Sequence, residues 1–176
     1  MEITIKKSRF YELFLSELRE MLWVEQKMWG MLRMMQRVAQ SQDFSRTLAQ
    51  SRVHASAHID RIRHLFDALD EPASGIESAA IGKLLQSVEA TVSKNREGAG
   101  TGDFALIIAA QKAGQYKVAS YENLITIAQV LGDKELEKVL EANIIEDAGT
   151  DLLLRELSER FIYQEAASRE AHRLPA

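Results

Sequence analysis

The chain has 176 residues, of which 46% are hydrophobic and 27% are charged, and its formal net charge is −4 at pH 7. This length suits one compact domain, and the weakly acidic charge argues against both a nucleic-acid-binding surface and a basic membrane-surface patch. Cysteine is absent, which excludes disulfides, thiol catalysis, zinc–thiolate sites and iron–sulfur clusters.

The sequence carries no signal for export or membrane insertion. The segment "MEITIKKSRF" lacks the apolar core of a signal peptide. No charge-free apolar run reaches the length that a transmembrane helix needs. We therefore expect a cytoplasmic protein.

A scarcity of helix breakers, with only two prolines, predicts an all-helical chain. The first helix is predicted from an N-cap at Ser8 to about Gln40. The polar turn "SQD" separates it from a second helix, from about Asp43 to Leu69. Because this turn is so short, the two helices are expected to lie antiparallel.

A shorter amphipathic helix, from about Glu77 to Lys94, is predicted after the segment "DEPASG". The glycine-rich stretch "REGAGTGD" lacks the lysine of a phosphate-binding loop and follows no strand, so we interpret it as a flexible connector. A third long helix is predicted from about Asp103 to Leu131, closed by Gly132.

The fourth long helix is predicted to begin after a cap at Asp133 and to run from about Lys134 to the mid 160s. The tail "SREAHRLPA" is expected to be frayed from about residue 168. Two helical hairpins are thus separated by a connection of about thirty residues, long enough to run the length of a bundle. The predicted fold is one ferritin-like four-helix bundle, residues 1–176, with a long crossover that carries a short extra helix.

Each long helix carries polar residues near the middle of its apolar stripe. In chain order they are Glu25; His54 and His58; Gln111, Gln115 and Glu122; and Asn143, Glu146, Asp147, Thr150 and Asp151. Carboxylates and histidines that project inward from facing helices build bundle metal sites, and carboxylate ligands suit iron or manganese. The candidate metal ligands are Glu25, His54, His58 and Glu146.

A structural role is the alternative for the same residues. A buried carboxylate such as Glu25 needs a cation, a hydrogen-bond donor or a proton of its own. Arginines at positions 19, 52 and 61 are available as partners, and a histidine on such a face is often a hydrogen-bonded core residue. His64 and His172 are expected to be solvent-exposed.

Four segments resemble a known family in the same order along the chain. They are "LREMLWVEQKM", "HASAHIDRIRHLFDAL", "DFALIIAAQKAGQYKVASYENL" and "LEANIIEDAGTDLLL". Each is similar to one helix of the YciE/YciF family of bacterial ferritin-like proteins, and the resemblance as a whole covers about residues 10–157. The resemblance implies a ferritin-like bundle with a dinuclear metal site and an association with bacterial stress responses.

This chain departs from the family pattern at the residues that would bind metal. Where the third helix of the family reads Glu-His-Tyr-Glu, this chain has Gly114 and Lys117 in place of the two glutamates. His54 and His58 stand at a family glutamate and glutamine, and Ile145 replaces one acid of the fourth helix, whereas Glu25, Glu146 and Asp147 match. The resemblance therefore implies a degraded site, able to hold a single divalent metal, iron or manganese, or none.

Two functions remain open, and so does the question of whether the protein is an enzyme. The first is a mononuclear or di-iron metalloprotein with oxidase or peroxide-handling activity on an unknown small molecule. The second is a non-catalytic or weakly metal-binding bundle that acts through self-association or a partner. The run "MWGMLRMMQ" places apolar residues on more than one helix face, so a homodimer is expected, with packing against the crossover helix as the alternative.

Overall fold

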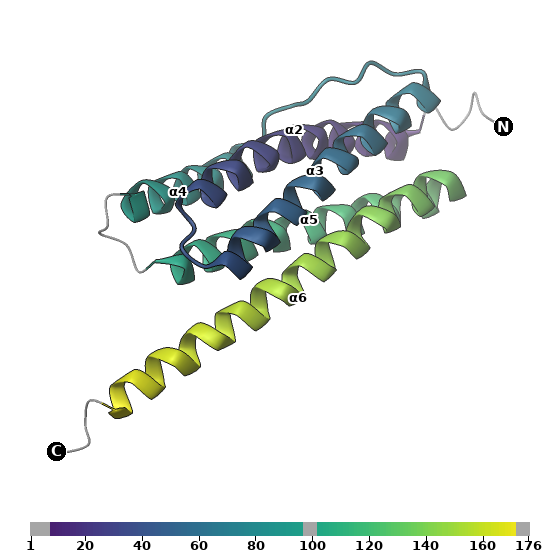
Figure 1. Cartoon of the computed structure of the whole chain (residues 1–176). Helices are drawn as coiled ribbons and strands as arrows, with labels where there is room; N and C mark the ends of the chain where they lie inside the picture. The colour runs from purple at the N-terminus through teal and green to yellow at the C-terminus, as the bar shows by residue number, and fades with distance from the viewer. Residues whose placement is uncertain (1–7, 97–101, 172–176) are drawn as a thin grey trace.

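A computed structural model describes residues 8–96 and 102–171, which form five helices and no strands (Figure 1). The helices are α2 (Arg9–Val38), α3 (Gln42–Leu69), α4 (Ala79–Arg96), α5 (Asp103–Leu131) and α6 (Lys134–Ala171). The predicted all-helical class is confirmed. The last helix runs past the mid 160s to Ala171; the rest of the expected frayed tail, with His172, and residues 97–101 of the expected connector lie outside the described residues.

The helix ends follow local capping chemistry, which the sequence predicts at Ser8, Gly132 and Asp133. The hydroxyls of Ser8 and Ser41 each accept a hydrogen bond from the backbone N–H three residues further on, at 3.1 and 3.3 Å. Gly132 ends α5 with φ at 73°, in the left-handed region that glycine tolerates best. The Asp133 carboxylate then accepts from the backbone N–H of Leu136 at 3.1 Å and caps α6.

Two antiparallel hairpins, α2 with α3 and α5 with α6, make the four-helix bundle, and α4 packs against α2 and α5 (Figure 1). Residues 70–78 run back along α2, where the backbone N–H of Ile76 donates to the carbonyl of Arg19. At the other end, the buried Asp103 carboxylate accepts from the backbone N–H of Gln40 at 2.9 Å and of Ser41, so α5 begins beside the α2–α3 turn. The crossover therefore spans the bundle, as the ferritin-like connectivity requires.

The core is apolar at both ends of the bundle and polar in the middle. Its largest fully buried side chains include Phe14, Phe44, Phe66 and Tyr121. In the methionine-rich run, Met31 is buried and Met34 is half-buried against the core, whereas Trp29 is 38% exposed. Within the described part of the chain, no helix combines the length and the apolar character needed to cross a membrane.

Candidate functional site

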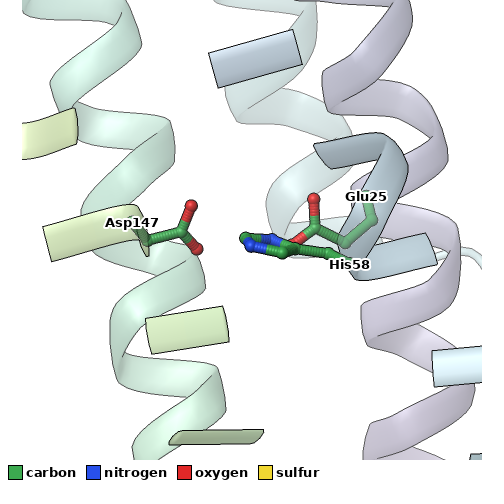
Figure 2. A group of neighbouring side chains, drawn as sticks. All are labelled: Glu25, His58 and Asp147. Carbon is green, nitrogen blue, oxygen red and sulfur yellow. The ribbon is translucent and has the colours of Figure 1, made fainter. Parts of the chain in front are cut away.

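Glu25, in the middle of α2, is completely buried and accepts from three groups, of which His58 is drawn in Figure 2. Its Oε1 atom lies 2.6 Å from the Tyr121 hydroxyl, 2.9 Å from Nδ1 of His58 and 3.0 Å from Nζ of Lys117. Burial raises the pKa of a carboxyl group, but the Lys117 ammonium and the His58 contact outweigh it, so the pKa of Glu25 lies below its ordinary value. The carboxylate in the apolar stripe of α2 is thus a paired anion.

Lys117 of α5 supplies a cation inside the core. Its Nζ atom lies 2.7 Å from Oδ1 of Asp147 on α6 and 3.0 Å from Oε1 of Glu25, and the residue is only 5% exposed. Burial lowers the pKa of an ammonium, but Glu25 and Asp147 outweigh it and raise the pKa of Lys117. Lys117 therefore stays charged and joins three helices.

His58 of α3 lies between two carboxylates. Nδ1 is 2.9 Å from Glu25 Oε1 and Nε2 is 3.0 Å from Glu146 Oε2, and the ring is completely buried. A carboxylate only accepts, so both contacts are satisfied only when each ring nitrogen carries a hydrogen. The edge of the ring meets Tyr121 in a T-shaped contact, with centroids 5.9 Å apart.

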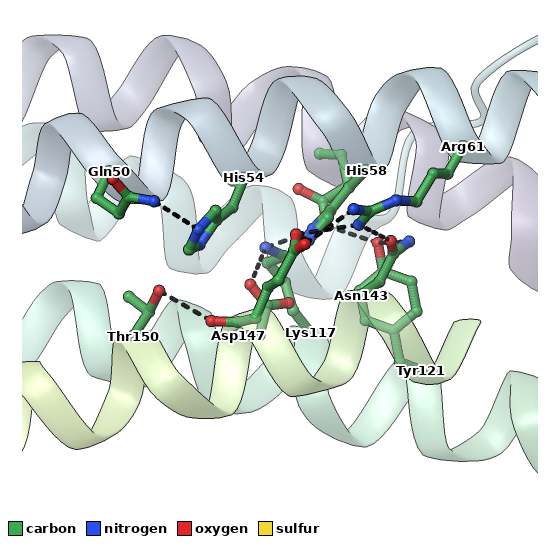
Figure 3. Close-up of polar contacts among 11 residues, drawn as sticks. Gln50, His54, His58, Arg61, Lys117, Tyr121, Asn143, Asp147 and Thr150 are labelled. Carbon is green, nitrogen blue, oxygen red and sulfur yellow. Dashed lines mark hydrogen bonds and ion pairs between the residues drawn. The ribbon is translucent and has the colours of Figure 1, made fainter. Parts of the chain in front are cut away.

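Glu146 of α6 is held by a two-pronged ion pair with Arg61, which is labelled in Figure 3. The Arg61 guanidinium places Nη2 2.8 Å from Oε1 and Nη1 3.0 Å from Oε2. Its hydrogen bonds are the main cause that lowers the pKa of Glu146 to about 2. Arg61 also donates to Asn143 Oδ1 at 2.8 Å, and Asn143 donates to the Tyr121 hydroxyl at 3.2 Å.

These contacts form one network across all four long helices, which we call the central network. Its members are Glu25, His58, Arg61, Lys117, Tyr121, Asn143, Glu146 and Asp147. Three carboxyl groups in it face three basic side chains. The charges are thus paired within the protein itself.

Two carboxylate oxygens of the central network remain without a hydrogen-bond partner among the described residues. They are Oε2 of Glu25 and Oδ2 of Asp147, both buried. Burial raises the pKa of Asp147, and Lys117 offsets this only in part. A cavity of about 30 Å³ lies beside Asp147 and Lys117 and is also lined by Gly114. A Cβ atom added at Gly114 would meet nothing within 4 Å.

Of the four predicted metal ligands, the structure brings three together in this network, Glu25, His58 and Glu146. His54 is half-buried and has its polar contact outside the network: its Nε2 is 2.8 Å from Gln50 Nε2, and only its ring touches the network, stacked on His58 with centroids 6.5 Å apart. Its Nδ1 has no partner within the described residues. His64 is exposed, as expected.

The predicted polar face of α5 is wrong in part. Gln115 and Glu122 are exposed, and the polar side chains buried in the middle of α5 are Lys117 and Tyr121. Residues 114, 117 and 121 share one face because they are three and four apart, a spacing that was readable from the sequence. The expected arginine partners lie elsewhere: Arg61 pairs with Glu146 rather than Glu25.

The residues present do not fit a dinuclear metal centre. Ligand atoms of Glu25, His58 and Asp147 lie within 4.8 Å of one another, a spacing that suits one ion. However, Lys117 Nζ contacts two of these carboxylates, and an ammonium and a metal ion that share the same oxygens repel each other. Glu146 is already engaged by Arg61, so too few carboxylates remain to neutralise two divalent ions.

Residues 9–167 match the family model described as a domain of unknown function, DUF892, so the chain belongs to this family. A segment of 67 residues is 37% identical to protein YciF of Escherichia coli K12; it spans 38% of this chain and 40% of that protein. The expected resemblance is confirmed.

Solved structures support the same fold. The E. coli stress protein YciF superposes with a TM-score of 0.79 at 23% identity, over 89% of this chain and 98% of YciF. YcfI of Rhodopseudomonas palustris superposes with a TM-score of 0.77 at 25% identity, over 84% of this chain and 94% of that one. The ferritin-like fold class is confirmed.

Proposed function

We propose that this DUF892 protein is a cytoplasmic, stress-related bundle that performs no dinuclear metal chemistry and acts through its surface, as a dimer. The description of E. coli YciF as a stress protein supports the stress-related part. One observation carries the absence of dinuclear metal chemistry: Lys117 Nζ lies 2.7 and 3.0 Å from Asp147 and Glu25, among the groups that a metal would need.

In this proposal the central network has a structural task. Its members come from α2, α3, α5 and α6, and each charged group has an opposite charge within contact distance. A buried ion pair adds little net stability, because desolvation offsets the attraction, but removal of one partner is strongly destabilising. The network therefore fixes the register of the four helices and leaves the outer helix faces for association.

The test is the metal content of protein purified without chelator and without a metal-affinity step. We expect iron, manganese and zinc to be far below one equivalent per chain. We also expect the melting temperature to be unchanged by excess chelator. A chelator would lower it only by removing a bound metal that stabilised the fold. About one or more equivalents of metal, with a lower melting temperature after chelation, would refute the proposal.

A mononuclear metalloprotein with oxidase or peroxide-handling activity is the second candidate. It is favoured by the free Oε2 of Glu25 and Oδ2 of Asp147, which lie beside His58 in the one group of described residues with metal-ligand spacing. This function requires the Lys117 ammonium to leave its two carboxylates. The same metal analysis, extended to protein incubated with excess iron or manganese, separates the two candidates.

A further inference from the structure

We propose that Lys117 alone excludes metal from the bundle centre. Its ammonium is the permanent counter-ion of Glu25 and Asp147, and its replacement by a neutral residue opens a latent site for one divalent cation. The inference rests on the function proposed above and goes beyond it, since it assigns metal exclusion to one side chain.

The position of the ammonium supports this role. Lys117 Nζ contacts one oxygen of Glu25 and one of Asp147, and these residues belong to the same group of three potential ligands as His58. A divalent ion bound by the same oxygens would lie within a few ångströms of Nζ. In a core with a low dielectric constant, this repulsion is much larger than in water.

Lys117 is also unable to withdraw at low free-energy cost. Its side chain is 6% exposed, so the ammonium would have to lose both ion pairs before it reached water. Movement of the ammonium to the surface would leave the completely buried carboxylate of Glu25 without this cationic partner. The ammonium thus competes with any metal from a fixed position rather than as a mobile surface charge.

Without the ammonium, the remaining groups have the chemistry of a metal site. Two carboxylates and an imidazole are suitable ligands for zinc, cobalt, manganese or iron. Histidine ligands in proteins usually donate their second ring N–H to a carboxylate, and His58 Nε2 already lies 3.0 Å from Glu146, which Arg61 holds in place. Nδ1, beside Glu25, is therefore the nitrogen that would face the ion.

The cavity beside Gly114 provides the remaining requirement, which is space. It borders Lys117 and Asp147, so replacement of Lys117 by a shorter side chain enlarges it beside the Asp147 carboxylate. A metal with three protein ligands takes a water molecule in its open position. Gly114 leaves that direction unobstructed, because no atom lies within 4 Å of its added Cβ.

The experiment compares wild type with Lys117→Met, and with Lys112→Met as the matched control, because Lys112 is an exposed lysine on the same helix. Each protein is titrated with cobalt(II), read by its visible absorption, and with zinc(II), read by calorimetry and melting. We expect Lys117→Met to bind one equivalent at least ~100-fold more tightly than wild type or Lys112→Met. Zinc at about 100 times Kd should raise its melting temperature by about 5–10 °C.

A double variant, Lys117→Met with Asp147→Asn, should lose this binding because one of the two carboxylates is gone. If Lys117→Met does not fold without metal, the test is made with Lys117→Gln and by refolding both variants with zinc. Failure of both variants to fold with zinc contradicts the inference, since the metal should replace the ammonium.

The outcomes separate this inference from the proposed function. If neither wild type nor the Lys117 variants bind metal, the inference is wrong and the metal-free function stands. If wild type binds one equivalent as tightly as Lys117→Met, both are wrong, because the ammonium then excludes nothing. Tight binding by the Lys117 variants alone supports both.

Discussion

Arg61 of α3 and Glu146 of α6 form a bidentate ion pair, with nitrogen–oxygen distances of 2.8 and 3.0 Å, and Glu146 also contacts the buried ring of His58. The pair lies at the edge of the core, where its side chains are 32% and 28% exposed. It therefore closes the central network on the solvent side and fixes the orientation of His58. Its effect on stability can be measured separately from that of the fully buried groups.

The ion pair predicts an acid-sensitive step in stability. The pKa of Glu146 is lowered to about 2 in the folded chain, from an ordinary value of 4.5. A carboxyl group with a depressed pKa stabilises the fold above its unfolded pKa, and this contribution is lost as the pH falls from about 4.5 towards 2. After allowance for solvent screening, we expect a loss of about 1–2 kcal/mol across this window.

The measurement is the free energy of unfolding in urea at a series of pH values from neutral to acid. Glu146→Gln should be less stable than wild type at neutral pH and should have a flatter acid limb. Glu122→Gln, which changes an exposed glutamate, should retain the wild-type profile. An unchanged acid limb in Glu146→Gln would mean that other carboxyl groups dominate acid unfolding.

A second prediction concerns Glu25 and Lys117 as a buried pair. Glu25→Gln leaves the buried ammonium with Asp147 alone, so we expect a loss of about 3–5 kcal/mol. If the loss comes from the unpaired charge, the double variant Glu25→Gln with Lys117→Met should lose less than the sum of the two single variants. Urea denaturation of the four proteins in metal-free buffer gives this coupling free energy. Additive losses would contradict a direct interaction.

The fold of this chain could be predicted from its sequence because the signals are local. Ser8, Ser41 and Asp133 cap helices through their own side chains, and Gly132 allows the left-handed turn after α5. The short turn between α2 and α3 and the long crossover then leave few ways to arrange four long helices.

The central network could be predicted only in part because it depends on the rotation of α5. This helix is rich in alanine and apolar residues on several faces, so periodicity did not separate Lys117 and Tyr121 from the exposed Gln115 and Glu122. A lysine is seldom found buried unless it is paired, and general propensity therefore places it at the surface. Its two partners, Glu25 and Asp147, come from helices distant in the sequence and are known only once the bundle is built.

The third prediction locates the expected dimer on α6. Ile145 and Leu152 are 69% and 57% exposed and seven residues apart, so they share one helix face. Lys138 lies seven residues before Ile145, and Glu159 lies seven residues after Leu152, and both are exposed. In an antiparallel twofold contact, each Lys138 faces the Glu159 of the other copy while the apolar residues meet in the middle.

Leu152→Glu should convert this dimer to a monomer in sedimentation equilibrium at micromolar concentration, without loss of helix content by circular dichroism. Leu13→Glu is the matched control, because Leu13 is 45% exposed on α2, away from the α6 face. A monomeric wild type would refute the dimer, and dissociation by Leu13→Glu alone would move the interface to the first helix.

The last prediction uses glycines with opposite surroundings. Gly114 lies inside α5, and a Cβ atom there meets nothing within 4 Å, whereas a Cβ at Gly75 would lie 3.1 Å from Cβ and 3.2 Å from Cα of Trp23. Glycine within a helix is less favourable than alanine by about 0.5–1 kcal/mol, so Gly114→Ala should raise the melting temperature by about 1–4 °C. Gly75→Ala should lower it, since the backbone contact cannot relax without displacing residues 70–78 from α2. The measurement is calorimetric melting of both variants, with Gly30→Ala as the control, because Gly30 is a second helical glycine in open space. If Gly114→Ala is destabilised while Gly30→Ala is stabilised, the prediction is wrong. The space next to Lys117 is then needed by the central network.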